Sequence, residues 1–240
     1  MRSILISIIL ASSTLSLGQY RMLGTSQVMD NGCIMLTPDM PFAEGLAYNY
    51  SRLDLEKYFE IQFDVFLGDK EEGADGITFV VHNDIRGFDA YGQWGECMGY
   101  GSFNPLNIGS SINPSVAVEF DTYQNRYQND PSCDHVAYLE NGSSRHEAYW
   151  NGGDSLYNME DNYLHDFRFR WNPSEQLIEV FWDGVKVVSQ KRDLIGDIFG
   201  GETQVIWGFT ASTGRKYNLQ YFCLRRMVGL PIEAESDNNG

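Results

Sequence analysis

Polar and apolar residues alternate along much of this chain, and this period of two constrains the fold more than any other feature of the sequence. Residues 61–65 read Ile-Gln-Phe-Asp-Val, and residues 165–171 and 178–182 repeat the pattern. Strict alternation is typical of a β-strand that buries one face. No segment of about twelve residues carries a helical stripe of apolar positions, so we expect strands to dominate the fold.

The other predicted strands are short, and clusters of Gly, Asn and Asp separate them. They cover residues 33–36, 46–50, 77–82, 115–121, 135–140, 205–211 and 219–226. Asp183-Gly184 separates two apolar runs, and such a pair supplies the positive φ angles of a tight hairpin turn. Residues 194–199 have the length of a single helical turn. Many short strands divided by turns predict an all-β fold, a β-sandwich of two packed antiparallel sheets.

The first 18 residues differ from the rest of the chain. Arg2 gives a positive start, residues 4–10 are apolar, and residues 12–18 are mostly small. This is the organisation of a secretory signal peptide, and the apolar run is far shorter than the roughly 20 residues of a membrane span. We therefore predict a signal peptide at 1–18, one domain at 19–230 and a polar acidic tail or linker at 231–240. The protein is expected to be secreted, or to lie at a bacterial surface or in the periplasm, with no membrane span.

Charge and composition exclude two classes of protein. The chain has 17 Lys plus Arg against 33 Asp plus Glu, a net charge of −16. Neutralising the phosphates of a nucleic acid requires clustered Lys and Arg, so we do not expect a nucleic-acid partner. With 42% hydrophobic residues the chain is too apolar to be intrinsically disordered.

The chain has four cysteines, at positions 33, 97, 133 and 223, and the predicted export decides whether we expect them to form disulfides. An even number in an oxidising compartment favours two disulfides over catalysis, and three pairings exist. We prefer Cys33 with Cys223, which joins the first and last predicted strands, and Cys97 with Cys133, which joins two loops. The alternative is a pair of free buried thiols.

The most informative segment is 116–136, in which six residues can supply metal ligands. Glu119 and Asp121 are two apart on a predicted strand, so their carboxylates lie on one face, where they repel unless a proton or a cation intervenes. The following loop and the next strand bring further oxygens and an imidazole; the full set is Glu119, Asp121, Tyr123 through its carbonyl, Asn125, Asp130 and His135. Oxygen ligands suit Ca²⁺, and imidazole with carboxylates suits a transition ion such as Mn²⁺. The alternative is a solvated acidic loop with a chance histidine. Six candidate ligands within one strand, the following loop and the next strand argue against it.

In identity and spacing these six residues resemble the metal signature of the legume-type (L-type) lectins. Two other segments extend the resemblance over roughly 32–224: Ala-Asp-Gly-Ile-Thr-Phe at 74–79, whose aspartate follows a cis peptide in the family, and Trp-Gly-Phe-Thr-Ala-Ser-Thr-Gly at 207–214. The closest similarity is to secreted bacterial members. The resemblance implies a concanavalin A-like jelly roll that binds glycans or glycoproteins without catalysis, and a homodimer through the back sheet is a further expectation.

The resemblance also implies roles for the metal ligands. Glu119 and His135 would bind the transition ion, Asp121 and Asp130 would bridge it to Ca²⁺, and the Tyr123 carbonyl with Asn125 would complete the calcium site.

A sugar site above the calcium is implied in the same way. Asp75 would accept hydrogen bonds from two sugar hydroxyls, because an ionised carboxylate has only acceptors. Asn125 would turn its NH₂ to the sugar, Tyr123 would present its ring, and the backbone at Gly214 and Arg215 would close the pocket.

Gly99 and His146 are two further positions predicted to lie beside this site. The glycine-rich loop departs from the family pattern because it reads Gly-Glu-Cys-Met-Gly-Tyr-Gly at 95–101. Gly99 is the predicted backbone donor there, and Glu96 is expected to intrude. His146 lies about as far beyond Asn125 as the mannose-contacting histidine of intracellular animal cargo lectins. This spacing makes it a candidate sugar contact, and the alternative is a loop histidine with no role.

Two other functions compete with the lectin. Glycoside hydrolases of related architecture resemble a Glu-x-Asp-x-x-Glu pattern, with catalytic carboxyls about 5 to 5.5 Å apart in retaining enzymes, but Gln124 stands at the third position here. A metal-stabilised adhesion or display module without sugar binding would keep the metal ligands and would not need Asp75. Because Asp75 and Asn125 are both present, we prefer the lectin.

Overall fold

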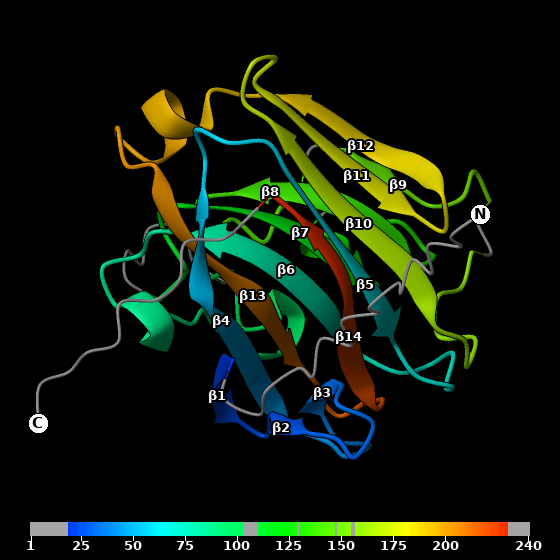
Figure 1. The fold of residues 1–240 in the computed structure, drawn as a ribbon. Helices are drawn as coiled ribbons and strands as arrows, with labels where there is room; N and C mark the ends of the chain where they lie inside the picture. Colours follow the sequence, from blue (N-terminus) through cyan, green and yellow to red (C-terminus); the bar gives the residue numbers. More distant parts are fainter. Residues whose placement is uncertain (1–18, 103–109, 129, 147, 155–156, 230–240) are drawn as a thin grey trace, which may run out of the picture.

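The computed structural model describes residues 19–102, 110–128, 130–146, 148–154 and 157–229. Within these ranges the chain forms two antiparallel sheets of seven strands each, which lie face to face (Figure 1). The predicted all-β sandwich is therefore confirmed. The predicted signal peptide and acidic tail lie outside the described residues.

The front sheet carries the predicted metal ligands at one end. Its strands run in the order β1 (Tyr20–Gly24), β4 (Glu44–Asp54), β13 (Gln204–Ser212), β6 (Gly76–His82), β7 (Ser115–Asp121), β8 (His135–Glu140) and β9 (Tyr149–Trp150). The back sheet runs in the order β12 (Val185–Lys191), β11 (Leu177–Trp182), β10 (His165–Asn172), β5 (Phe59–Phe66), β14 (Gln220–Val228), β3 (Ile34–Thr37) and β2 (Gln27–Val28). Strands that are distant in sequence pair in both sheets, as in a jelly roll.

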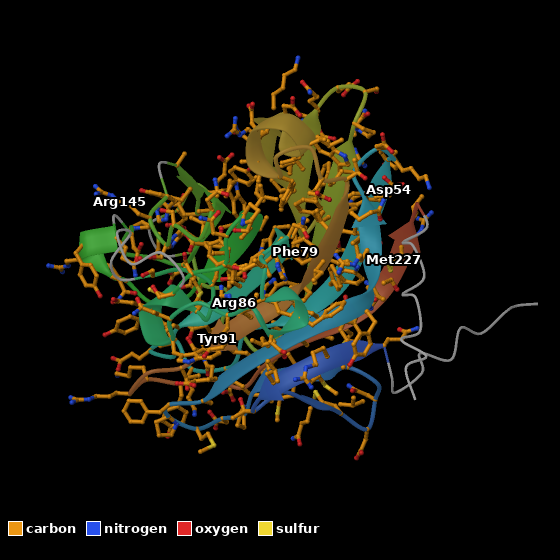
Figure 2. The ribbon with its side chains drawn as sticks, turned by 90° about the vertical axis from the view of Figure 1, so that its left-hand side faces the viewer. Asp54, Phe79, Arg86, Tyr91, Arg145 and Met227 are labelled. Carbon is orange, nitrogen blue, oxygen red and sulfur yellow. A yellow bond between two sulfur atoms is a disulfide. The ribbon has the colours of Figure 1, made fainter. Side chains whose placement is uncertain are left out.

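The alternation in the sequence translates directly into packing. Along β5 and β10 every second residue is buried, and phenylalanines from both sheets meet in the core. The Phe63 ring lies 4.8 Å from that of Phe209 and 5.6 Å from that of Phe167, centroid to centroid. Figure 2 shows Phe79 of β6 in the middle of the molecule, between the sheets. Burying such side chains is worth roughly 1.5–3 kcal/mol each, so this aromatic core is the main stabilising element.

A second, smaller core lies on the outer face of the front sheet. Because side chains alternate along β6, Phe79 enters the main core while Val80 points outward. Val80 packs there with Tyr48 and Tyr100, beneath the segment that carries the short 3-10 helices η1 (Gly87–Asp89) and η2 (Gly95–Cys97). Tyr48 donates its hydroxyl hydrogen to the Ala90 carbonyl, which helps to hold this segment on the sheet. The second core thereby fixes the glycine-rich loop beside the end of β7.

The predicted hairpin and most predicted strands are confirmed. β7, β8 and β11 match their expected bounds, and the turn residues Asp183 and Gly184 have φ of 48° and 79°. The short strands β1, β2 and β9 were not predicted, because two to five residues show too little alternation to be recognised. The expected helical turn at 194–199 is a short π-helix over Leu194–Ile198. A third 3-10 turn, η3 (Arg126–Gln128), lies in the loop between β7 and β8.

Of the two predicted disulfides, one is present. Cys33 and Cys223 are bonded across β3 and β14, as expected. The pairing of Cys97 with Cys133 is wrong, because both are free thiols held by different loops. Cys97 Sγ lies 3.7 Å from Ser144 Oγ, whereas Cys133 Sγ accepts a hydrogen bond from Asn151 Nδ2.

Candidate metal centre and the adjoining surface

The register of β7 and β8 assembles the centre. Val118 and Phe120 enter the core between the sheets, so Glu119 and Asp121 point to the outer face of the front sheet. Asp121 pairs directly with His135, the first residue of β8. Opposite residues of neighbouring strands share a face, and the imidazole therefore joins the two carboxylates. Glu119 is 2% exposed, Asp121 5% and His135 1%.

The loop between these strands returns a third carboxylate to the same place. The Tyr123 amide donates to Asp121 Oδ1 at 2.8 Å, and the Asn125 amide donates to Asp130 Oδ2 at 2.6 Å. The 3-10 turn η3 follows Asn125, and the Gln128 amide donates to the Asn125 carbonyl. These bonds close the loop tightly, so that Asp130 lies against the end of β7.

Two groups of side chains offer ligand atoms close enough to share an ion. One is Glu119, His135 and His146, and the other is Asp121, Asp130 and His135; within each group the atoms lie within 4.8 Å of one another. Among the described residues, His135 Nε2 and Asn125 Oδ1 are buried without a hydrogen-bond partner. A buried polar atom without a partner is costly, and both atoms are ones that the sequence assigns to metals.

Burial and mutual repulsion make the carboxylates hard to ionise without a cation. Desolvation, followed by the charges of Glu119 and Asp130, raises the pKa of Asp121 well above its usual range. Desolvation likewise raises the pKa of Asp130 to about 6, and it lowers the pKa of His135 to about 3, with help from His146. A neutral imidazole and closely spaced carboxylates are the forms that bind divalent ions. The residues present therefore fit the predicted pair of ions.

Asp75 lies beside this centre on a separate loop. The Ala74-Asp75 peptide is cis, as the resemblance implies. The Asp75 amide donates to the Ser212 carbonyl at 3.0 Å, and its carbonyl accepts from Thr122 at 3.1 Å, so β13 and the end of β7 hold its main chain from both sides. Burial, and then the nearby charge of Glu96, raises the pKa of Asp75 to about 7. Asp75 Oδ2 has no partner among the described residues, and it lies 3.7 Å from where a Cβ of Gly214 would be.

Glu96 reaches into the same region, as the glycine-rich loop predicts. Asn125 Nδ2 donates to Glu96 Oε2 at 3.2 Å, and Gln128 Nε2 donates to the Glu96 carbonyl at 3.1 Å. A carboxylate of the chain itself therefore accepts one of the two hydrogens of the amide group that the resemblance assigns to a sugar.

Two residues predicted to contact a sugar have partners within the chain, and their contacts to a sugar stay predictions. Gly99 donates its N–H to the Gln93 carbonyl at 2.8 Å, so that group is engaged within the loop. His146 is 3% exposed, and its Nδ1 lies 2.9 Å from Glu119 Oε1. The loop after β8 folds back over the end of β7, which turns this imidazole into the metal cluster and away from the surface.

Tyr123 and Arg215 lie at the surface near these groups. Tyr123 is 41% exposed and lines a hollow of about 350 Å³ with Lys216, and Arg215 is exposed. Their predicted contacts to a sugar, and the use of the Tyr123 carbonyl by calcium, stay predictions.

The position of His146 in the cluster is what sequence reasoning missed. Within the sequence only its spacing from Asn125 marks it, and the loop that follows β8 leaves the direction of its side chain undetermined. The short strand β9 pairs with β8, with Ala137 opposite Tyr149, and this pairing brings His146 back to Glu119.

A two-sheet sandwich with a buried cluster of carboxylates and histidines at the end of adjacent strands defines a narrow class of protein. The family model described as legume lectin beta-barrel domain matches residues 12–226, and the chain belongs to this family.

Solved legume lectins share the fold at low sequence identity. The metal-free form of lectin I-B4 from Griffonia simplicifolia is 21% identical with a TM-score of 0.72, and the match covers 91% of this chain and 95% of that one. Lectin II from Ulex europaeus is 17% identical with a TM-score of 0.72, covering 89% and 94%. A lectin from Bauhinia forficata, solved with GalNAc, is 21% identical with a TM-score of 0.68, covering 87% and 91%.

Among the described residues, no helix is long and apolar enough to cross a membrane.

Proposed function

We propose that this protein is a secreted lectin in which Ca²⁺ and a transition ion order a shallow saccharide site. The observation that carries the proposal is the pair of unpartnered buried oxygens, Asn125 Oδ1 and Asp75 Oδ2, next to three buried carboxylates. One oxygen is positioned for a cation and the other for a donor from a ligand. Glycans and glycoproteins are the proposed partners.

The proposed metal ligands are the residues that the structure gathers at the ends of β7 and β8. Glu119 and His135 would hold the transition ion, Asp121 and Asp130 would lie between the ions, and Asn125 Oδ1 with the Tyr123 carbonyl would face Ca²⁺. When bound, the ions supply positive charge that offsets the repulsion among the carboxylates. The chain itself orients the Asn125 side chain, because Nδ2 donates to Glu96 and Oδ1 would then face the calcium.

Asp75 supplies the acceptor of the proposed site. A carboxylate can accept from two neighbouring hydroxyls at once, which suits the vicinal diol of a sugar. The bonds from Ser212 and Thr122 fix its main chain, so little ordering is needed when a sugar binds. A Cβ at Gly214 would lie 3.7 Å from Oδ2, so a longer side chain there would add bulk beside the buried acceptor.

We infer that sugar binding is not followed by catalysis. Glu119 and Asp121 are almost fully buried and lie within the metal cluster, where they would be poor proton donors to a glycosidic oxygen. Gln124 stands where related hydrolases have a glutamate. Release of reducing sugar from β-glucans or galactans, lost in Glu119→Gln, would establish the hydrolase instead.

A metal-stabilised display module is the second candidate, and Glu96 is the observation that favours it. Its carboxylate accepts one of the two hydrogens of Asn125 Nδ2, so a sugar hydroxyl would compete with Glu96 for this group. Under this alternative the metals stabilise the fold and no glycan binds.

A glycan array separates these candidates. The purified chain is applied with Ca²⁺ and Mn²⁺, and again after removal of the ions with a chelator. The lectin predicts binding that requires the ions and is abolished in Asp75→Asn. Asp89→Asn is the matched control, because Asp89 is an exposed aspartate paired with Arg21, and it should bind like the wild type. Binding that survives the chelator, or no binding in either condition, contradicts the proposal.

Export and dimerisation complete the proposal. The predicted signal peptide supports secretion, and N-terminal sequencing of protein from the medium should begin near Gln19. The predicted homodimer through the back sheet is tested by light scattering, where a monomer mass at micromolar concentration would contradict it.

A further inference from the structure

We propose that His146 is a direct ligand of the transition ion, so that this centre prefers Zn²⁺ to Mn²⁺. The inference rests on the proposed function, which places a transition ion beside Glu119 and His135. It adds a protein ligand to that ion and changes the ion's identity.

The distances around Glu119 suit one ion. His146 Nδ1 lies 2.9 Å from Glu119 Oε1, and His135 Nε2 lies 3.9 Å from the same oxygen. Donors about 2.1 Å from one ion are about 3.0 Å apart at right angles and about 3.4 Å apart in a tetrahedron. The measured separations bracket these values, so shifts of a few tenths of an ångström would bring all three atoms to a common ion.

The surroundings of His146 also suit a metal ligand. The His146 ring is buried and lies 4.8 Å from the His135 ring, centroid to centroid. Tyr149 places its ring edge-on to both imidazoles, at 5.6 Å from His135 and 5.7 Å from His146. His135 Nε2 has no hydrogen-bond partner in the described part of the chain. A hollow of about 680 Å³ between β8 and β12 is lined in part by His146 and Tyr149.

The set of donor atoms decides which ion is favoured. Carboxylate and water oxygens suit Mn²⁺, whereas imidazole nitrogen suits Zn²⁺. With Asp121 and Asp130 between the two ions, His146 would raise the imidazole ligands of the transition ion from one to two beside three carboxylates. Compared with a site that has His135 alone, the second imidazole therefore increases the preference for Zn²⁺.

His146 has one other role to consider, which is to hold Glu119 in place through a hydrogen bond. Loss of such a supporting bond typically costs 10 to 100-fold in metal affinity, so weaker binding in a variant does not identify a ligand. Zn²⁺ also outcompetes Mn²⁺ at most sites. The number of coordinated nitrogens, and the change in selectivity when the imidazole is removed, distinguish the two roles.

The test uses the full chain, stripped with a chelator, dialysed and supplied with excess Ca²⁺. Pulsed EPR of the Cu²⁺-loaded protein counts coordinated imidazoles, and elemental mass spectrometry measures the metals bound from a limiting mixture of Zn²⁺ and Mn²⁺. His146→Gln keeps a side-chain donor that can reach Glu119 but has no imidazole. His82→Gln is the control, because His82 is equally buried and lies in the second core, against Tyr48.

We expect two imidazoles in the wild type and in His82→Gln, and one in His146→Gln, with the Zn²⁺ to Mn²⁺ selectivity at least tenfold lower in His146→Gln. One imidazole in the wild type overturns the inference, and this result does not depend on the folding of any variant. Unchanged selectivity in His146→Gln overturns it as well. If one imidazole is found while sugar binding still requires the ions, only this inference fails; if no transition ion binds, the metal part of the proposed function fails with it.

Discussion

Replacing Glu160 with glutamine should change how the stability of this protein depends on pH. Glu160 is 2% exposed, and its Oε1 accepts a hydrogen bond from Asn218 Nδ2 at 2.6 Å. Its Oε2 is buried without a partner among the described residues. Burial, and then the charge of Asp134, raises the pKa of Glu160 to about 9. The side chain is therefore protonated in the folded protein at neutral pH and ionised in the unfolded chain.

The sign and size of the effect follow from this difference. Between about pH 5 and pH 9 the folded protein holds one more proton than the unfolded chain at this position, so the free energy of unfolding falls as pH rises. One proton corresponds to about 1.4 kcal/mol per pH unit. Glutamine keeps the acceptor for Asn218 and has no charge to lose. From pH 6 to pH 8, the free energy of unfolding of Glu160→Gln should therefore rise by about 3 kcal/mol relative to that of the wild type.

The assay is urea unfolding of both proteins at several pH values, with Ca²⁺ and the transition ion saturating. Comparing the two proteins removes the titration of groups that they share, including Asp134. Glu175→Gln is the control, because Glu175 is an exposed glutamate in a turn. Parallel curves of stability against pH for Glu160→Gln and the wild type would refute the reasoning, since they would mean that Glu160 is ionised in the folded state.

Three other predictions concern the site and the disulfide. Glu96→Ala frees Asn125 Nδ2 and removes a charge beside Asp75, so the affinity for a neutral monosaccharide measured by calorimetry should rise several-fold; weaker binding would show that Glu96 contacts the sugar. Replacing Cys33 and Cys223 together with alanine removes a link between residues 190 positions apart, which the loop-entropy relation values at about 5 kcal/mol of unfolding free energy; urea unfolding with an unchanged midpoint would contradict this. Chelation should destabilise the protein more at pH 7 than at pH 5, because Asp130, with a raised pKa of about 6, protonates at pH 5 and relieves the repulsion among the carboxylates. A difference in melting temperature between the ion-loaded and the chelated protein that is larger at pH 5 than at pH 7 would argue against this.

Glu160 also links stability to the proposed sugar site. Asn218, which donates to Glu160, donates to the Lys70 carbonyl as well, and Lys70 returns its amide hydrogen to Asn218 Oδ1. This network holds the loop that ends at Asp75. We expect a change at Glu160 to affect the order of Asp75 more than that of Glu119, which lies on β7.

The sequence predicts the sheets well because alternation is a local signal. Along β10 each side chain is placed by its immediate neighbours, and the aromatic residues at alternate positions all reach the core. The Glu119 and Asp121 pair is predicted for the same reason, since two residues on one strand necessarily share a face. The strands β2 and β9 are only two residues long, and they form because longer strands offer edges for pairing.

The errors concern contacts that depend on the path of a loop. Cys97 and Cys133 were paired because an even number of cysteines in an exported chain favours disulfides, but the second core fixes Cys97 beside Ser144 while Cys133 lies against Asn151. The amide of Gly99, the predicted sugar donor, bonds to the Gln93 carbonyl within the turn. No count of residues along the chain predicts either outcome, because both depend on how the outer segment packs on β6.

His146 shows how one tertiary contact changes the chemistry of a site whose other members are evident from the sequence. The spacing of Glu119, Asp121 and His135 predicts a cluster with one imidazole. The pairing of β9 with β8 adds a second imidazole, which contacts Glu119, whereas the Asn125 side chain donates to Glu96. Under the proposed function, the ion held by Glu119 would therefore change identity without any change in the residues proposed to contact a sugar. Selectivity for the transition ion would then depend on the segment after β8, and specificity for the glycan on the loops that carry Asp75, Glu96 and Gly214.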